Sequence, residues 1–273
     1  MSTNQTKGTA VVTGASTGIG AIYADRLAKR GYDLLLVARS KDRLAAQARR
    51  LAGQTGRKVE MVAADLASPT GLARVEDILR TNADISLLVN NAGAAAVTPL
   101  MDSDIEKMDD LIRLNVTALT RLTYAAVPQF VARGRGTIIN IASIVAIAPE
   151  VLNGVYGGSK AFVLALTQSL VHELAGKGVR VQAVLPGATA TELWDKSGKP
   201  LHELPQEIVM SADDMVDAAL AGLDLGETIT IPALANRAEW DRFEAARLAM
   251  SGKLSSAVAA PRYHLHQHQS RSA

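Results

Sequence analysis

Short apolar runs rich in β-branched residues recur along the chain, separated by longer segments with a helical spacing of apolar positions. The runs predict six strands and a weaker seventh, over residues 8–14, 32–38, 58–65, 85–93, 136–143, 179–187 and 227–233. The longer segments predict helices over residues 18–30, 41–53, 69–81, 102–132, 155–176, 211–222 and 236–250. Strand and helix therefore alternate along most of the chain.

The predicted strands are almost continuously apolar, which is typical of strands buried on both faces of a parallel sheet. Right-handed crossover connections place helices on both faces of such a sheet. We therefore expect an α/β fold with one doubly wound parallel sheet of about seven strands flanked by helices. Residues 1–260 are expected to form a single domain, and the polar residues 261–273 a flexible C-terminal tail.

Residues 188–210 interrupt the alternation of strand and helix. They contain Gly198, Pro200 and Pro205, which break regular structure. In open α/β sheets, ligands bind outside the carboxyl ends of the strands. The pattern therefore predicts a loop-rich substrate segment over that edge of the sheet.

Composition narrows the class of protein. The chain is 48% hydrophobic and 21% charged with a net charge of +2, as in ordinary soluble proteins, and nothing in it indicates nucleic acid or an acidic membrane as partner. It has no cysteine, which excludes disulfides, thiolate nucleophiles and cysteine metal sites. The first residues lack a signal-peptide pattern, and no run approaches the ~20 apolar residues that span a bilayer. We expect a soluble, cytoplasmic protein.

Three of the five histidines lie in the tail, at positions 264, 266 and 268. Their alternate spacing allows a metal site to be imagined, but alternation in a polar terminus is usually just a solvated tail. We therefore expect no metal.

A glycine-rich turn, TGASTGIG, follows the first predicted strand and opens the first predicted helix. Gly14 allows the turn, Gly18 allows backbone to approach a diphosphate, and Gly20 allows the helix to pack closely on the strand. The free N–H groups at the start of the helix then face an anion. The spacing differs from G-x-G-x-x-G, and no Gly-Lys-Ser/Thr follows, so a triphosphatase loop is excluded.

The second predicted strand ends in VARSKDR, where a dinucleotide-binding fold places a group for the adenosine ribose. Arg39 and Ser40 stand where a carboxylate would bind a free 2′-hydroxyl. An arginine instead holds a 2′-phosphate through paired hydrogen bonds. Asp42 offers an alternative partner for Arg39. We predict NADP (NADPH) as the cofactor.

Tyr156 and Lys160 lie four residues apart in VYGGSKA, on one face of a predicted helix. A free tyrosine has a pKa near ~10, and a cation one turn away is expected to lower that pKa. Such a phenol exchanges protons efficiently with an alcohol or an alkoxide. Gly157 and Gly158 between them each cost about 1 kcal/mol of helix stability relative to alanine, which indicates a demand for space.

Six motifs in order and at intact spacing resemble the classical short-chain dehydrogenases/reductases. They are TGASTGIG, NNAG (90–93), Asn115 in RLNVTA, Ser143 in NIAS, Tyr156-x-x-x-Lys160 and the PG at 186–187, over roughly residues 8–195. The resemblance implies a Rossmann-type fold and an NADP-preferring oxidoreductase. It also implies a homodimer or homotetramer formed through the long helices.

The resemblance implies a role for each of four catalytic residues. Tyr156 is the general acid/base, and Ser143 hydrogen-bonds the substrate oxygen. Lys160 supports the phenol and binds the nicotinamide ribose, and Asn115 holds a water in a proton relay. The implied cofactor-binding residues, besides Tyr156 and Lys160, are Gly14, Ser16, Thr17, Gly18, Ile19, Gly20, Arg39, Ser40, Asp65, Leu66, Asn91, Ala92, Gly93, Pro186, Gly187 and Thr191.

Substrate specificity is expected in residues 93–97, 144–153 and 188–210, which are mainly apolar. The first two stretches carry no cation for a substrate anion, and Glu150 would oppose one. We therefore expect a neutral, fairly hydrophobic ketone or aldehyde, or its alcohol. Trp194 is expected either to close over the substrate or to anchor the loop.

Two alternatives remain open. A reductase of 3-oxoacyl groups on acyl carrier protein needs a basic docking patch, for which Arg133 and Arg135 are the candidates. A non-catalytic NADP-binding regulator does not need the complete set of serine, tyrosine and lysine that this chain has.

Overall fold

The computed structural model describes residues 6–263. Its contacts divide the chain into two compact units, one up to Ala233 and one from Leu234 onward, and each is described by itself. The expectation of a single domain over residues 1–260 stays a prediction.

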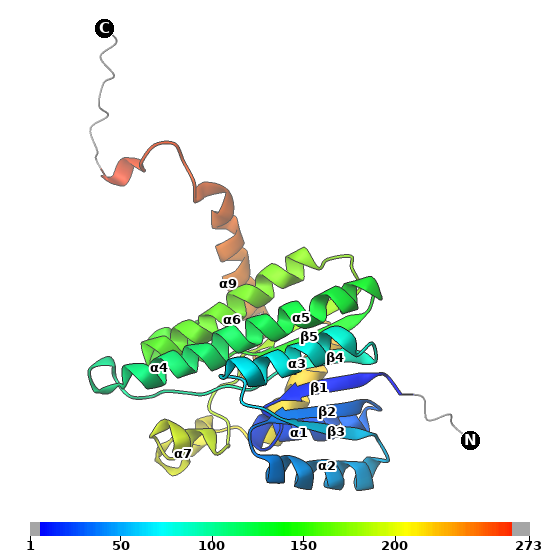
Figure 1. Ribbon diagram of the computed structural model, residues 1–273. Coiled ribbons are helices and arrows are strands. Elements are labelled where there is room, and N and C mark those ends of the chain that lie inside the picture. The colour runs from blue at the N-terminus through cyan, green and yellow to red at the C-terminus, as the bar shows by residue number, and fades with distance from the viewer. Residues whose placement is uncertain (1–5, 264–273) are drawn as a thin grey trace. The chain divides into compact units, whose positions relative to one another are not determined.

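The first unit is built on a seven-stranded parallel sheet in the order β3-β2-β1-β4-β5-β6-β7 (Figure 1). All seven predicted strands are present, with somewhat narrower bounds. They are β1 (Thr9–Thr13), β2 (Asp33–Ala38), β3 (Val59–Ala63), β4 (Ile85–Asn90), β5 (Gly136–Ile141), β6 (Val179–Val184) and β7 (Ile229–Thr230). The doubly wound α/β fold is confirmed, and the chain reverses its direction of travel across the sheet between β1 and β4.

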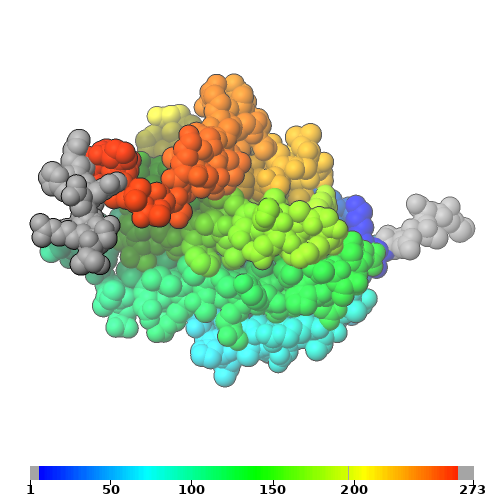
Figure 2. All heavy atoms as spheres, turned by 90° about the horizontal axis from the view of Figure 1, so that it is seen from above, coloured from blue at the N-terminus to red at the C-terminus, as the bar shows by residue number. Residues whose placement is uncertain are grey.

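Helices cover both faces of the sheet, as the apolar pattern predicts. One face carries α1 (Gly18–Lys29), α2 (Lys41–Thr55) and α8 (Ala212–Asp224). The other carries α3 (Pro69–Thr81), α5 (Leu119–Ala132) and α6 (Gly154–Glu173). Figure 2 looks onto this second layer, where α6 (yellow-green), α5 (green) and α3 (cyan) lie side by side.

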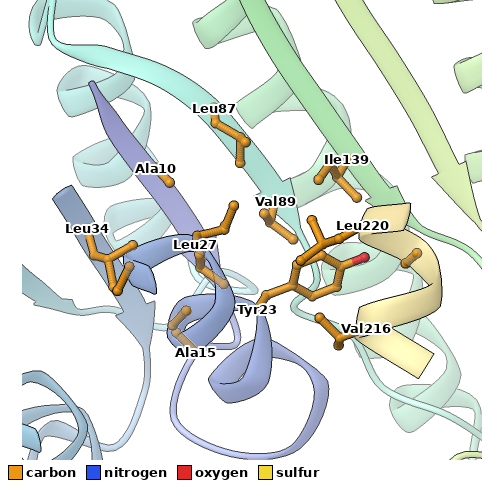
Figure 3. Packing of buried hydrophobic residues seen from close by; sticks show 14 of the residues in the cluster. Ala10, Ala15, Tyr23, Leu27, Leu34, Leu87, Val89, Ile139, Val216 and Leu220 are labelled. Carbon is orange, nitrogen blue, oxygen red and sulfur yellow. The ribbon is translucent and has the colours of Figure 1, made fainter. Parts of the chain in front are cut away.

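The core beneath α1 is centred on Tyr23, which is fully buried. Its ring lies among apolar side chains of the sheet, such as Val89 and Ile139, and of α8, such as Val216 and Leu220 (Figure 3). Because α1 is packed this tightly, the glycine turn that precedes it has a fixed position over the end of β1.

The prediction of one continuous helix over residues 102–132 is wrong, because the helix is interrupted. After a 3₁₀ turn at Leu100–Asp102, α4 (Ile105–Ile112) passes through a π-helical turn at Arg113–Ala118 into α5. The π turn places Asn115 inside the protein, where its side chain bonds both backbone groups of Ala94. Single π turns inside α-helices occur frequently at functional sites.

Residues 188–210 are loop-rich as predicted, with three short helical pieces. These are α7 (Leu193–Ser197) and 3₁₀ turns at Leu201–Glu203 and Gln206–Ile208. A parallel bridge between Thr189 and Met210 closes the base of the segment.

The second unit contains the predicted amphipathic helix as α9 (Arg237–Met250), in which the rings of Trp240 and Phe243 lie 5.3 Å apart. The predicted tail begins with a 3₁₀ turn at Pro261–Tyr263, and its three histidines lie outside the described residues. Over residues 6–263, no helix is both long and apolar enough to cross a membrane. The same residues contain no cluster of three or more side chains suited to a metal.

Candidate active site

A cleft of about 540 Å³ opens at the carboxyl ends of the parallel strands. It is lined by the segments that follow β1, β2, β3, β4, β5 and β6. The cleft therefore spans the point between β1 and β4 where the strand order reverses, which is where open α/β sheets bind ligands.

The glycine turn after β1 forms one wall of the cleft. Gly14 and Gly18 have φ values of +67° and +54°, a conformation that other residues rarely adopt. A Cβ on Gly20 would lie 2.3 Å from the Gly14 carbonyl oxygen, so only glycine permits the close packing of α1 on the turn. The side chain of Thr17 does not cap α1, so the first N–H groups of the helix are left for a ligand.

The NNAG segment after β4 is bound to this turn by hydrogen bonds. The Thr13 hydroxyl accepts from the backbone N–H groups of Asn91 and Ala92 at 2.9 and 3.0 Å. The Asn91 side chain donates to the carbonyl oxygens of Thr13 and Gly14. A Cβ on Gly93 would lie 3.1 Å from Oδ1 of Asn115 and 3.6 Å from the Lys160 ammonium, so Gly93 keeps this part of the cleft wall thin.

The ends of β2 and β3 line the far part of the cleft. Arg39 is exposed there and pairs with no carboxylate among the described residues, so its predicted alternative partnership with Asp42 does not form. Asp65 and Leu66 line the same part. Oδ1 of Asp65 accepts the N–H of Ala67, so this carboxylate also fixes the turn that leads to α3.

The four predicted catalytic residues are all buried, with exposed fractions between 2% and 8%. The Ser143 and Tyr156 hydroxyls are hydrogen-bonded. The Lys160 ammonium donates to the Ile141 carbonyl at 2.9 Å and lies 5.9 Å from the centre of the Tyr156 ring. The Asn115 side-chain amide donates to the hydroxyl of Ser159, the residue before Lys160, at 3.1 Å.

The loop after β6 closes the site beside Ser143. The carbonyl of Pro186 accepts the Ser143 hydroxyl at 3.3 Å and the N–H of Ile144 at 3.0 Å. Gly187 and Thr191 line the cleft, and the Thr191 methyl group would lie 3.2 Å from a Cβ on Gly18. The cleft thus brings together all the predicted site residues except Gly20 and Asn115, which support it from behind.

Comparison with known proteins agrees with this geometry. The family model described as short chain dehydrogenase matches residues 8–201. The chain belongs to the short-chain dehydrogenase/reductase family. Members of this family are oxidoreductases that act on CH–OH and C=O groups.

Several relatives share most of the chain. A short-chain dehydrogenase from Sphingobium yanoikuyae, solved in complex with NADPH, is 49% identical and superposes with a TM-score of 0.91, covering 94% of this chain and 99% of that one. The bulky-bulky ketone specific alcohol dehydrogenase from Comamonas testosteroni is 42% identical with a TM-score of 0.87, over 95% and 99% of the two chains. The very-long-chain 3-oxoacyl-CoA reductase of Rattus norvegicus is 34% identical over 223 residues, which cover 79% of this chain and 68% of the relative.

The acid–base properties of the short-chain dehydrogenase site differ from the sequence prediction. Burial raises the pKa of the Tyr156 phenol, and the hydrogen bond with Ser143 opposes this rise only in part. The predicted lowering of that pKa by Lys160 is therefore wrong for this structure. Burial also lowers the pKa of the Lys160 ammonium to about 8, because its amine is removed from water without a carboxylate beside it.

The substrate part of the cleft is mostly apolar, as predicted. Its wall includes Ala94, Ala95, Val145, Val151, Leu152, Leu193 and Trp194, whereas Ile147 and Glu150 do not line it. Trp194 both lines the cleft and anchors the loop, since its Nε1 donates to the Thr189 carbonyl at 3.0 Å.

Arg43 and Leu114 line the cleft but were not predicted to belong to the site. Glu192, Lys199, Leu204, Pro205 and Ile208 also line it and lie within the predicted substrate segment 188–210. Arg43 lies in the first turn of α2, four residues after Arg39, which precedes the helix. Nothing in the sequence indicates its contact with Glu192, which is 149 residues away.

Proposed function

We propose that this protein is an NADP-dependent oxidoreductase. It interconverts a neutral, fairly hydrophobic ketone or aldehyde and its alcohol, with Tyr156 as the general acid/base. The observation that carries the proposal is the buried cluster of Ser143, Tyr156 and Lys160, which faces a glycine-lined cleft. Family relatives with NADPH bound and with ketone-specific activity support it.

The cleft fits a dinucleotide along its whole length. The glycine turn and the uncapped start of α1 offer N–H groups to a diphosphate, and Gly93 leaves space beside Lys160. Arg39, exposed and unpaired, is suited to a 2′-phosphate. Bound NADPH supplies the hydride, and the protein supplies orientation and proton transfer.

The proton chemistry follows from the burial of Tyr156. Because its pKa is raised, the phenol keeps its proton at neutral pH and is ready to donate it to an oxygen that gains negative charge. The Ser143 hydroxyl holds the same oxygen in place. The Lys160 amine, which donates to the Ile141 carbonyl at the end of β5, is held beside the Tyr156 ring, where it is suited to bind the nicotinamide ribose.

The substrate class is inferred from the wall of the cleft. Two alanines after Gly93 leave room for a bulky group, and leucine, valine and tryptophan side chains favour an apolar one. Lys199 is the one lysine or arginine among the described lining residues of the substrate loop. Residues 93–97 and 144–153 carry no cation, as the sequence shows, whereas the loop contributes Lys199.

Lys199 also favours a second candidate, a reductase of 3-oxoacyl thioesters, whose carrier groups are anionic. The 3-oxoacyl-CoA reductase relative supports the same candidate. The predicted docking patch supports it less, because Arg133 uses its guanidinium to bind the Ala83 and Ile85 carbonyls.

We further propose that the protein is a homodimer or homotetramer. Apolar side chains on α4, α5 and α6 are exposed, with Ile105 74%, Tyr124 68% and Phe162 39% accessible. Light scattering coupled to size exclusion measures the assembly, and a monomer at all concentrations would contradict it.

The test of function compares NADPH and NADH consumption over neutral ketones, diketones, aldehydes and a 3-oxoacyl thioester, with Tyr156→Phe as the variant. We expect turnover that prefers NADPH and is lost in Tyr156→Phe, while NADPH affinity is retained. Retained turnover in the variant would refute the role of Tyr156. NADPH binding without turnover on any substrate would favour the regulator.

A further inference from the structure

An ion pair joins the start of α2 to the substrate loop at the edge of the cleft. Nη1 of Arg43 lies 3.0 Å from Oε2 and 3.4 Å from Oε1 of Glu192. Both residues line the cleft, as do Arg39 and Ser40. The contact therefore links the part of the cleft beyond β2 to the segment that forms the substrate wall.

The two arginines at the start of α2 differ in what they contact: Arg39 precedes the N-cap Ser40, and Arg43 lies in the first turn. They are four residues apart in the sequence and line the same cleft. Arg39 has no ion-pair partner among the described residues, whereas Glu192 holds Arg43. A phosphate near Arg39 thus lies within reach of a second guanidinium that is already engaged.

We propose that a 2′-phosphate on the adenosine ribose takes Arg43 from Glu192, so that binding of the phosphate releases the substrate loop from α2 at this point. Arg43 is then a second phosphate-binding residue and Glu192 its internal competitor. A dinucleotide without the phosphate leaves the pair intact. The inference rests on the proposed NADP dependence.

The exposure of the pair makes the exchange feasible. The Arg43 and Glu192 side chains are 54% and 48% exposed, and ion pairs between exposed side chains are weak. A phosphate monoester carries a charge of about −1.5 to −2 at pH 7 and three acceptor oxygens, against one charge on a carboxylate. It also accepts paired hydrogen bonds from a guanidinium. The phosphate therefore competes with Glu192 for the Arg43 guanidinium, and breaking the exposed ion pair costs little free energy.

The experiment uses the full chain and two small probes, 2′,5′-ADP and 5′-AMP, which differ by the 2′-phosphate. Their affinities are measured by calorimetry for the wild type, Glu192→Gln and Arg43→Gln. Asp195→Asn is the matched control, because it removes the same charge from the same loop at an exposed residue that makes no contact with Arg43.

We expect Glu192→Gln to bind 2′,5′-ADP about two- to fivefold more tightly, the range that an exposed ion pair allows, with 5′-AMP unchanged. Arg43→Gln is expected to weaken 2′,5′-ADP binding about tenfold, as for the loss of a charged hydrogen bond, again with 5′-AMP unchanged. Asp195→Asn should alter neither affinity beyond about twofold, because its charge is exposed and screened.

Trp194 reports on the loop directly. The chain has two tryptophans, so Trp240→Phe leaves Trp194 as the only indole. In that background, 2′,5′-ADP is expected to change the Trp194 fluorescence more than 5′-AMP does. Glu192→Gln alone should produce part of the same change without any probe.

The outcomes separate this inference from the proposed function. Suppose that the wild type binds 2′,5′-ADP more tightly than 5′-AMP. If Glu192→Gln then raises the affinity for both probes equally, or raises the affinity for 2′,5′-ADP no more than Asp195→Asn does, the competition is refuted while NADP dependence stands. Unchanged 2′,5′-ADP affinity in Arg43→Gln also refutes it. If the wild type shows no preference for 2′,5′-ADP, the NADP preference fails and this inference fails with it.

Discussion

Gly157 and Gly158, next to Tyr156, the proposed general acid/base, are predicted to respond in opposite ways to substitution by alanine. Both lie in the first turn and a half of α6. A Cβ on Gly158 would meet nothing within 4 Å. A Cβ on Gly157 would lie 3.1 Å from both Cα and Cβ of Pro149, which belongs to the 3₁₀ turn at Pro149–Val151.

The magnitudes follow from these contacts. Alanine in place of glycine inside a helix stabilises by about 0.4–1 kcal/mol, so Gly158→Ala should raise the free energy of unfolding by that amount. Gly157→Ala has the same helical gain but compresses a backbone contact, and overpacking typically costs about 1–3 kcal/mol. Its net effect is expected to be destabilising by up to about 2 kcal/mol. It should also displace Val151, which lines the cleft.

The assay is urea unfolding of both variants and the wild type, with thermal melts in parallel. A gain of 1 kcal/mol should raise the Tm of a chain of this size by about 2–4 °C. Gly158→Ala should leave turnover unchanged, whereas Gly157→Ala should raise KM for the ketone. The exposed Phe162 lies one turn after Gly158 on α6, on a surface that we propose forms subunit contacts. Each melt is therefore run at two protein concentrations to separate folding from assembly. Destabilisation by Gly158→Ala at both, or stabilisation by Gly157→Ala, would refute the reasoning.

Three further predictions concern buried polar groups. Burial lowers the pKa of Lys160 from 10.5 to about 8, so between these values the unfolded chain holds a proton that the folded chain has lost. The free energy of unfolding should therefore rise with pH across this window. Urea unfolding of the wild type and of Lys160→Met should show the rise only in the wild type. Asn115→Ala leaves the Ala94 N–H without its acceptor and should cost about 1–3 kcal/mol in the same assay, with Asn115→Asp recovering part. Burial raises the pKa of the Glu76 carboxyl, but hydrogen bonds from Arg121 and Arg80 outweigh burial, so the net pKa lies below its usual value of 4.5. The stabilisation from Glu76 is therefore present above pH 4.5 and is lost as the pH falls below it. Acid unfolding of Glu76→Gln should show a shallower dependence on pH than that of the wild type.

The strands and the reaction class could be predicted because they depend on local signals. Continuous apolar runs mark strands buried on both faces, and the glycine turn and the Tyr-x-x-x-Lys spacing are each contained in a few residues. The break in the helix predicted over residues 102–132 could not be seen this way. It depends on hydrogen bonds between Asn115 and Ala94, which lie on different segments and meet only in the folded chain.

Burial decided the other differences. The spacing of Tyr156 and Lys160 correctly predicts that they share a helix face, but the pKa direction of the phenol depends on how completely both groups leave water. Likewise, two adjacent glycines look equivalent in the sequence, and only the position of Pro149 distinguishes them.

The way each part of the site is anchored explains why the sequence predicts the reaction better than the substrate. Lys160 bonds the backbone at the end of β5, and Asn115 bonds the segment just after β4, the neighbouring strand. The proposed proton-transfer groups are therefore fixed by the sheet, whose register follows from the apolar pattern. The substrate wall instead comes from short 3₁₀ turns and from residues 188–210, whose ends are joined by the Thr189–Met210 bridge and which contact α2 through the Arg43–Glu192 pair. Since the Arg43–Glu192 contact joins residues far apart in the chain, the shape of the pocket depends on tertiary packing, and substrate choice must be inferred from the folded loop.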